Sequence, residues 1–179
     1  MLTKYNIDKK TGIIAAAVSV GVLAIGGGGS FYFSPYLALN QMKTAIVNRD
    51  AAALSKQIDF PELRTSVKAG VRSQVLRLVT LAGTEATPEM LEKINREVDK
   101  KITPEGLDEL MQDKIPGARL DVSELEKNIA DSEIQMKYES LDKFVIIVTD
   151  KKDRAKTVNL TLNRTGFDWK LAGVNISKV

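Results

Sequence analysis

The chain has 179 residues, of which 44% are hydrophobic and 27% are charged. It contains no Cys and no His, which excludes disulfides, thiolate nucleophiles, catalytic pairs built on imidazole and the usual zinc sites. The formal net charge is +3, but most of it comes from lysines in the first ten residues, and the rest of the chain is nearly balanced. Nucleic acid is therefore not an expected partner, because proteins that bind it gather basic residues on one face. No motif indicates a cofactor.

An uncharged, mostly apolar segment, residues 12–33, predicts a transmembrane anchor. As a helix the segment would be about 33 Å long at about 1.5 Å per residue, which matches a hydrocarbon core of about 30 Å. The aromatic residues 31–33 would then lie at the far interface of the bilayer. The alternative is a cleaved secretory signal, because the uninterrupted run 12–25 is short and the glycines after it suit a peptidase site. Both interpretations predict export of the remaining chain.

The distribution of lysines indicates the orientation of the anchor. Three lysines lie before the apolar segment, and the next basic residue is Lys43. Basic residues stay on the cytoplasmic side, so residues 1–11 are expected to be a cytoplasmic stub and residues 34–179 a single exported domain. Small residues give the anchor a smooth face that would let another membrane helix approach, although such residues are common in all membrane helices. These residues are Ala17, Gly21, Gly26, Gly27, Gly28 and Gly29.

After the anchor, apolar residues at helical spacing predict about five helices, with one or two further helical turns in residues 122–129. Each predicted start carries a side chain that caps helices or a proline suited to the first turn. The starts are Ser34–Pro35, Asp50, Asp59 or Phe60 before Pro61, Thr87 and Thr103.

The third predicted helix, residues 61–81, is the longest and is expected to pack against the sheet. Its apolar side consists of Val67, Val71, Val75 and Leu78. The opposite side carries a basic stripe, which consists of Arg64, Lys68 and Arg72. The favoured interpretation of the stripe is an ordinary solvated face, and the alternatives are contact with anionic lipid headgroups or with a protein partner. A further alternative is pairing with the segment 85–133, which holds 14 acidic and 7 basic residues.

After residue 131 the apolar period changes from about 3.6 to two, which predicts a four-stranded antiparallel meander. The run 144–148 is apolar on both faces, as in a central strand, while residues 150–156 and 164–167 have hairpin-loop composition. The expected apolar face consists of Val158, Leu160, Leu162, Phe167, Trp169 and Leu171. Helices followed by strands predict an α+β domain with the helices on one face of the C-terminal sheet.

Two pairs of carboxylates are the candidates for acid–base catalysis. They are Asp108 with Glu109 and Asp150 with Asp153. The first pair is expected on the polar side of a helix and the second in a charged hairpin loop, where neither carboxyl group would have the shifted pKa that proton transfer near neutral pH requires. Neither place supplies the converging oxygens of a calcium site. We therefore predict no catalytic, metal or cofactor site.

Five stretches together resemble the bacterial family called domain of unknown function 2939. They are "SPYLAL", "AIVNRDAAALSKQIDFPELR", "TPEGL", "KYESLDKFVI" and "FDWKLAGVNI". The resemblance extends over nearly the whole chain from Ser34. It implies a bacterial protein in the cytoplasmic membrane, with its N-terminus inside and its domain in the periplasm or outside the cell, and it implies no activity.

A looser similarity is to cystatin-like or nuclear transport factor 2-like cones. It consists of Ala45, Asp50, Ala53 and Leu54 before the sheet and Trp169, Lys170 and Leu171 in its last strand. The chain departs from that pattern by about 50 helical residues between the two parts.

Two functions remain open. The first is a membrane-anchored binding or scaffolding module of the cell envelope, with membrane lipid and a second envelope or membrane protein as partners. The alternative is an enzyme that uses carboxylates in a cone-shaped pocket. The sequence identifies neither a ligand nor an oligomeric state.

Overall fold

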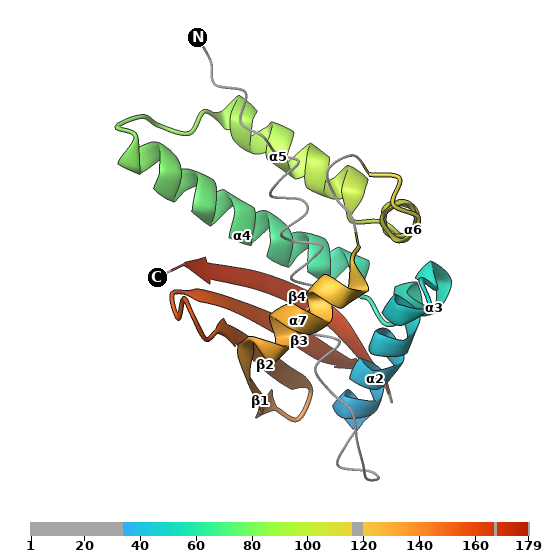
Figure 1. Ribbon diagram of the computed structural model, residues 1–179. Coiled ribbons are helices and arrows are strands. Elements are labelled where there is room, and N and C mark those ends of the chain that lie inside the picture. Colours follow the sequence, from blue (N-terminus) through green and yellow to red (C-terminus); the bar gives the residue numbers. More distant parts are fainter. Residues whose placement is uncertain (1–33, 116–119, 167, 179) are drawn as a thin grey trace.

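The computed structural model describes residues 34–115, 120–166 and 168–178, which form six helices and four strands (Figure 1). The helices are α2 (Ser34–Val47), α3 (Ala51–Lys56), α4 (Phe60–Leu81), α5 (Pro88–Lys101), α6 (Pro104–Met111) and α7 (Val122–Ala130). The strands are β1 (Ser132–Ser140), β2 (Lys143–Asp150), β3 (Lys156–Thr165) and β4 (Asp168–Lys178). The predicted anchor with its small residues lies outside the described residues, as does Phe167. Among those that are described, no helix combines the length and the hydropathy needed to cross a membrane.

Four of the five predicted helix starts are confirmed by their caps. The Asp50 and Asp59 carboxylates each accept a hydrogen bond from the backbone N–H three residues later, at 2.8 and 3.2 Å. The hydroxyls of Thr87 and Thr103 accept in the same way at the starts of α5 and α6. Each bond satisfies an N–H group that has no partner within its own helix. The segment expected to hold a turn or two is a longer helix, α7, capped by Asp121.

The predicted meander is confirmed, because all three strand pairs are antiparallel and follow the order β1-β2-β3-β4. Met136, Ile146, Leu160 and Val174 lie opposite one another across the four strands. Residues opposite one another in a sheet share a face, so this row belongs to one apolar face of the sheet.

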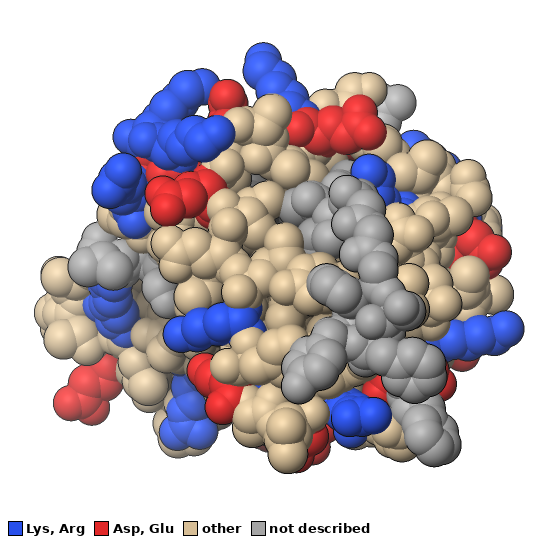
Figure 2. Space-filling model, turned by 90° about the horizontal axis from the view of Figure 1, so that it is seen from below, with Lys and Arg blue, Asp and Glu red and all other residues tan. Residues whose placement is uncertain are grey.

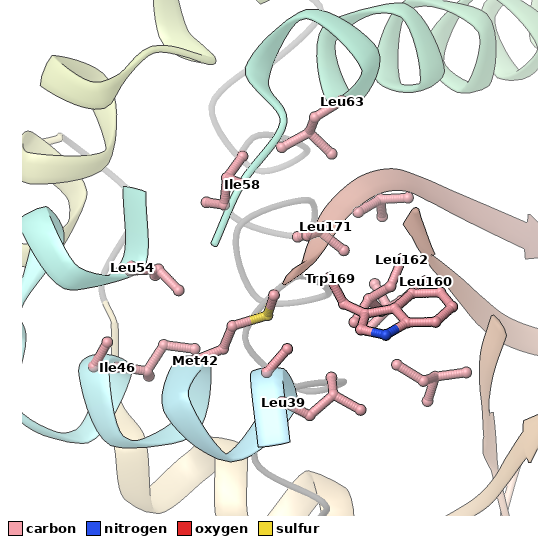
Figure 3. Packing of buried hydrophobic residues seen from close by; sticks show 14 of the residues in the cluster. Leu39, Met42, Ile46, Leu54, Ile58, Leu63, Leu160, Leu162, Trp169 and Leu171 are labelled. Atoms are coloured by element: carbon pink, nitrogen blue, oxygen red, sulfur yellow. The ribbon is translucent and has the colours of Figure 1, made fainter. Parts of the chain in front are cut away.

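The core lies between the apolar face of the sheet and α2. Figure 3 shows Met42 of α2 pointing toward Leu171 and Trp169 of β4. Leu39 and Met42 are fully buried, and Trp169 is 1% exposed. Full burial of a large apolar side chain contributes about 1.5–3 kcal/mol, so this layer is the main source of stability. Side chains from α3, α4 and α7 complete the same cluster.

The long helix α4 lies along the outer edge of β4. Ser66 Oγ accepts a hydrogen bond from Val174 N at 3.1 Å and donates to Val174 O at 3.2 Å. Gln74 Nε2 donates to Ile176 O at 3.2 Å. These side chains satisfy backbone groups that an edge strand otherwise exposes. Helix α4 therefore seals the β4 edge of the sheet.

The segment that leads into α4 extends this seal. Leu171 N donates to Gln57 O at 2.8 Å, and Asp59 N donates to Leu171 O at 2.9 Å, which forms a short parallel bridge at Ile58. The register shifts between Leu171 and Gly173, opposite Leu162 and Thr161 of β3. A bulge of this kind adds one residue to a strand, and here it turns the backbone groups of Leu171 and Val174 toward the same edge.

The predicted packing of α4 is partly wrong. Val67 and Val75 are buried as expected, and Val71 is half-buried, but Leu78 is 41% exposed. The helix that covers the apolar face of the sheet is α2, which buries six residues, whereas α4 buries three. The helical period indicates which residues lie on the same side of a helix. The width of that apolar side decides which helix covers the apolar face of the sheet.

Candidate functional site

The basic stripe of α4 is largely occupied by contacts within the domain. Lys68 Nζ lies 2.6 Å from Asp99 Oδ1 of α5, and Arg64 Nε lies 4.0 Å from the same oxygen. Arg64 Nη1 also donates to Ile102 O at 3.4 Å. Of the three residues of the stripe, only Arg72 is exposed, whereas Arg64 and Lys68 are half-buried. The expectation of a solvated stripe therefore holds for Arg72 and not for the other two. The acidic segment 85–133 supplies the carboxylate, because α5 folds back along α4 (Figure 1).

Helices α4 and α5 form a hairpin whose closed end carries four large, exposed apolar side chains. We call this end the hairpin tip, and it comprises Leu76, Leu78, Leu81 and Met90. Their exposed fractions are 40%, 41%, 76% and 43%. The connection between the helices turns at Gly83, whose φ of +68° is a conformation that glycine adopts without strain.

The exposure of the tip follows from the way in which α4 is held. The hydrogen bonds from Ser66 and Gln74 fix the middle of α4 to β4. The final turns of α4 and the first turn of α5 extend to the end of the hairpin that lies away from α2 and α3 (Figure 1). Leu81 is the last residue of α4 and is the most exposed of the four apolar side chains. The tip thus combines a rigid helical support with large exposed apolar groups.

Each of the two predicted carboxylate pairs has a member in a structural position. Asp108 Oδ2 accepts from Gln112 Nε2 at 2.6 Å within the polar side of α6. Asp150 Oδ1 accepts from the backbone N–H groups of Lys152 and Asp153 at 2.7 and 3.2 Å. These backbone hydrogen bonds hold the pKa of Asp150 below its usual value. A carboxyl group of this kind is ionised at neutral pH, and its oxygen already serves the turn between β2 and β3.

A cone-shaped pocket would have to open on the apolar face of the sheet. That face is filled by α2 side chains, since Leu39, Met42, Leu160 and Leu162 are each fully buried in one cluster. A shallow hollow does occur on the outer side of α2. It is lined by Asn40, Lys43, Thr44, Val47 and Asn48. The resemblance to cystatin-like cones stays a prediction.

The end of the sheet next to the first turn of α2 carries an aromatic cluster. Trp169 Nε1 donates to Ser34 Oγ at 2.6 Å. The rings of Tyr36 and Tyr138 meet Phe144 edge to face at 5.2 and 5.0 Å between centroids. We call this the junction end, because the predicted anchor would join it at Ser34. The sheet and the start of α2 are therefore one connected unit.

Leu141, in the β1–β2 turn at the junction end, is 90% exposed. Sequence reasoning missed both Leu141 and the hairpin tip. The signal for Leu141 was an apolar residue in the short turn between β1 and β2, where polar residues and glycine are usual. The signal for the tip was an excess of leucines in the last turns of α4, since Leu76, Leu78 and Leu81 cannot all face one side of a helix.

The comparisons with known proteins give one match. A family model described as a protein of unknown function (DUF2939) matches residues 24–110. The match includes α2 to α5 and most of α6, and thus the whole α4–α5 hairpin, but it ends before the sheet and is shorter than the predicted resemblance. No curated protein and no solved structure shows significant similarity to the chain. Residues 24–110 of the chain therefore match the family of domain of unknown function 2939, to which its sequence motifs predicted a resemblance.

Proposed function

We propose that the chain is a single-pass membrane protein with an exported, non-catalytic domain that binds another protein of the cell envelope through the hairpin tip. The observation that carries this proposal is the exposure of four large apolar side chains on the end of one helical hairpin. Leu78 and Leu81, three positions apart, lie on neighbouring sides of α4, and exposed apolar groups that are neighbours mark interaction sites more often than isolated ones do.

The chemistry of the tip fits a protein partner. Burial of apolar surface contributes about 25 cal/mol per Å², and Leu81 and Met90 have much of their surface left to bury. The backbone at the tip is helical and anchored through α4, so binding would need little ordering of the main chain. A helix or groove with a complementary apolar face is the expected counterpart.

The position of the tip fits a domain held at a membrane. The predicted anchor would join α2 at Ser34, whereas the connection between α4 and α5 lies at the opposite side of the domain (Figure 1). A tether at Ser34 would therefore leave the tip accessible. In the bacterial setting proposed here, the membrane is the cytoplasmic membrane, residues 1–11 lie inside, and the domain is periplasmic or extracellular.

A photo-cross-linking amino acid placed at Leu81 of the full chain in the native cell tests the binding proposal. We expect a discrete adduct from position 81 and none from the exposed control position Glu126 on α7. The adduct should disappear when Leu78→Asp is added, because a charge at the tip would have to be buried in the interface. Equal labelling from both positions, or no adduct at 81, would contradict the proposal.

Membrane anchoring is tested separately. The full chain should remain with membranes after a carbonate wash, and its domain should be digestible from the outer side only. A mature N-terminus between Gly27 and Phe31 would instead show that the segment is a cleaved signal.

The proposal that the domain is non-catalytic rests on Asp108 and Asp150, whose carboxylates already accept hydrogen bonds within the fold. Alanine at Asp108, Glu109, Asp150 and Asp153 should leave the cellular phenotype intact, whereas deletion of residues 12–33 should abolish it. The reverse result would favour the enzyme alternative.

A further inference from the structure

We propose that the junction end of the domain is a second membrane contact, in which Leu141 inserts into the lipid interface beside the anchor. This inference rests on the proposed anchor at residues 12–33. The lipid surface is the contact partner of this exposed apolar side chain, which lies at a defined place in the fold.

The first step is the distance between the anchor and the domain. The predicted anchor ends at residue 33, and α2 begins at Ser34. One residue of extended chain spans at most about 3.6 Å, so the chain has no linker that would hold the domain away from the bilayer. The first turn of α2 must then lie at the membrane interface.

The second step is a chain of contacts from Ser34 to Leu141. Trp169 Nε1 donates to Ser34 Oγ at 2.6 Å, and Trp169 lies opposite Arg164 in the β3–β4 pair. Arg164 N donates to Asp142 O at 2.8 Å, and Asp142 follows Leu141 in the β1–β2 turn. These contacts are all within regular strands, turns or the fixed start of a helix. The position of Leu141 relative to Ser34 is therefore set by the fold.

The third step is the character of the surface at this end. Leu141 is 90% exposed, Leu37 in the first turn of α2 is 59% exposed, and Tyr138 is 44% exposed. Membrane interfaces favour tyrosine because its ring is apolar and its hydroxyl end is polar, and an exposed leucine supplies apolar surface that can insert. Figure 2 shows the domain from below, with uncharged side chains across much of that face and acidic and basic side chains interspersed around them.

The charged side chains at the junction end do not favour binding to an anionic membrane surface. Glu139 and Lys143 form a mutual ion pair at 2.7 Å, and Arg164 and Asp142, of opposite formal charge, are joined by a backbone hydrogen bond from Arg164 N to Asp142 O. Opposite charges that offset one another give little attraction to anionic headgroups. The contact should therefore depend on apolar insertion and be similar in anionic and zwitterionic bilayers.

The absence of cysteine from the chain makes a direct test straightforward. Full-length Leu141→Cys carries a nitroxide label and is reconstituted into vesicles of mixed phosphatidylethanolamine and phosphatidylglycerol, and separately into phosphatidylcholine vesicles. A matched protein carries the label at Glu85→Cys, which is exposed in the α4–α5 connection. Circular dichroism checks that both labelled proteins keep the parent fold, as expected for two exposed positions.

We expect the label at position 141 to lose accessibility to a water-soluble nickel complex and to gain accessibility to oxygen, in both kinds of vesicle. The label at position 85 should remain accessible to the nickel complex. Flotation of the same samples separates the two proposals. Protein that floats with the vesicles but has equally water-accessible labels overturns the second contact and leaves the anchor intact, whereas protein that fails to float overturns both. Loss of the effect in phosphatidylcholine alone would overturn the apolar contact in favour of an electrostatic one.

Discussion

The core between α2 and the sheet and the hairpin tip treat the same kinds of side chain in opposite ways. In the core Trp169 is 1% exposed and Phe144 is fully buried. At the hairpin tip Leu81 is 76% exposed and Met90 is 43% exposed. The exposure differs because α2 forms a second layer over the sheet, whereas the ends of α4 and α5 at the tip pack only against each other.

This difference assigns stability and binding to separate places. The apolar groups between α2 and the sheet are removed from water and hold the fold together. Those of the hairpin tip remain in water and contribute little to the fold, so their surface is available to a partner. Substitutions at the two places should therefore have separable effects.

The largest effect is expected from Leu39→Ala, which removes a fully buried side chain of α2. The cavity and the lost burial should lower the free energy of unfolding by about 2–5 kcal/mol. Leu37→Ala, two residues earlier on the exposed side of the same helix, is the matched control and should stay within about 0.5 kcal/mol. Urea unfolding of the detergent-solubilised full chain, followed by the fluorescence of the single Trp169, measures both. Equal losses would mean that α2 does not form the second layer.

A smaller loss is expected from Ser66→Ala at the sealed edge of β4. The hydroxyl holds both Val174 N and Val174 O, and its removal leaves partly buried backbone groups without that partner. The expected cost is about 1–3 kcal/mol. Ser73→Ala on the same helix is the control, because the Ser73 hydroxyl bonds only within α4, to Gly70 O. If Ser66→Ala and Ser73→Ala unfold at the same urea concentration, the seal contributes nothing to stability.

The parts of the fold that could be predicted were those with local causes. Four helices are capped through hydrogen bonds to residues three positions away, by Asp50, Asp59, Thr87 and Thr103. The apolar period of two indicates the strands directly. Both signals are contained within a few residues of sequence.

The parts that could not be predicted depend on distant pairs. The bond between Ser34 and Trp169 joins residues 135 positions apart, and the bond between Ser66 and Val174 joins residues 108 apart. The seal of the β4 edge also needs a bulge, which no residue pattern in the sequence predicts. The basic stripe was misread for the same reason, because its partner Asp99 lies on the next helix and is brought close only when the hairpin closes.

That hairpin contact gives a smaller and more specific prediction. Lys68→Asp should place two carboxylates side by side in α4 and α5 and lower stability by about 0.2–1 kcal/mol, the usual range for a partly exposed pair. The double variant Lys68→Asp with Asp99→Lys should recover most of the loss, because it restores opposite charges. The same reversal at Arg72, which is exposed, should have a smaller effect. A double variant no more stable than the single one would show that the pair does not hold the hairpin closed.

The smallest effect on stability is expected at the hairpin tip. Leu81→Asp replaces a side chain that is 76% exposed at the C-terminal end of α4, so the urea midpoint should correspond to a change within about 0.5 kcal/mol of the parent. A negative charge at a helix C-terminus is slightly unfavourable, which sets the direction of that small change. Leu81→Asn has nearly the same shape without the charge and serves as the control for this term. Both variants should nevertheless reduce the adduct formed in the cell by a cross-linker at Leu78, because each replaces an apolar contact with a polar group that an interface would have to bury. A loss of stability comparable to that of Leu39→Ala would mean that the tip belongs to the core of the domain, and the contrast between the core and the tip would then be wrong.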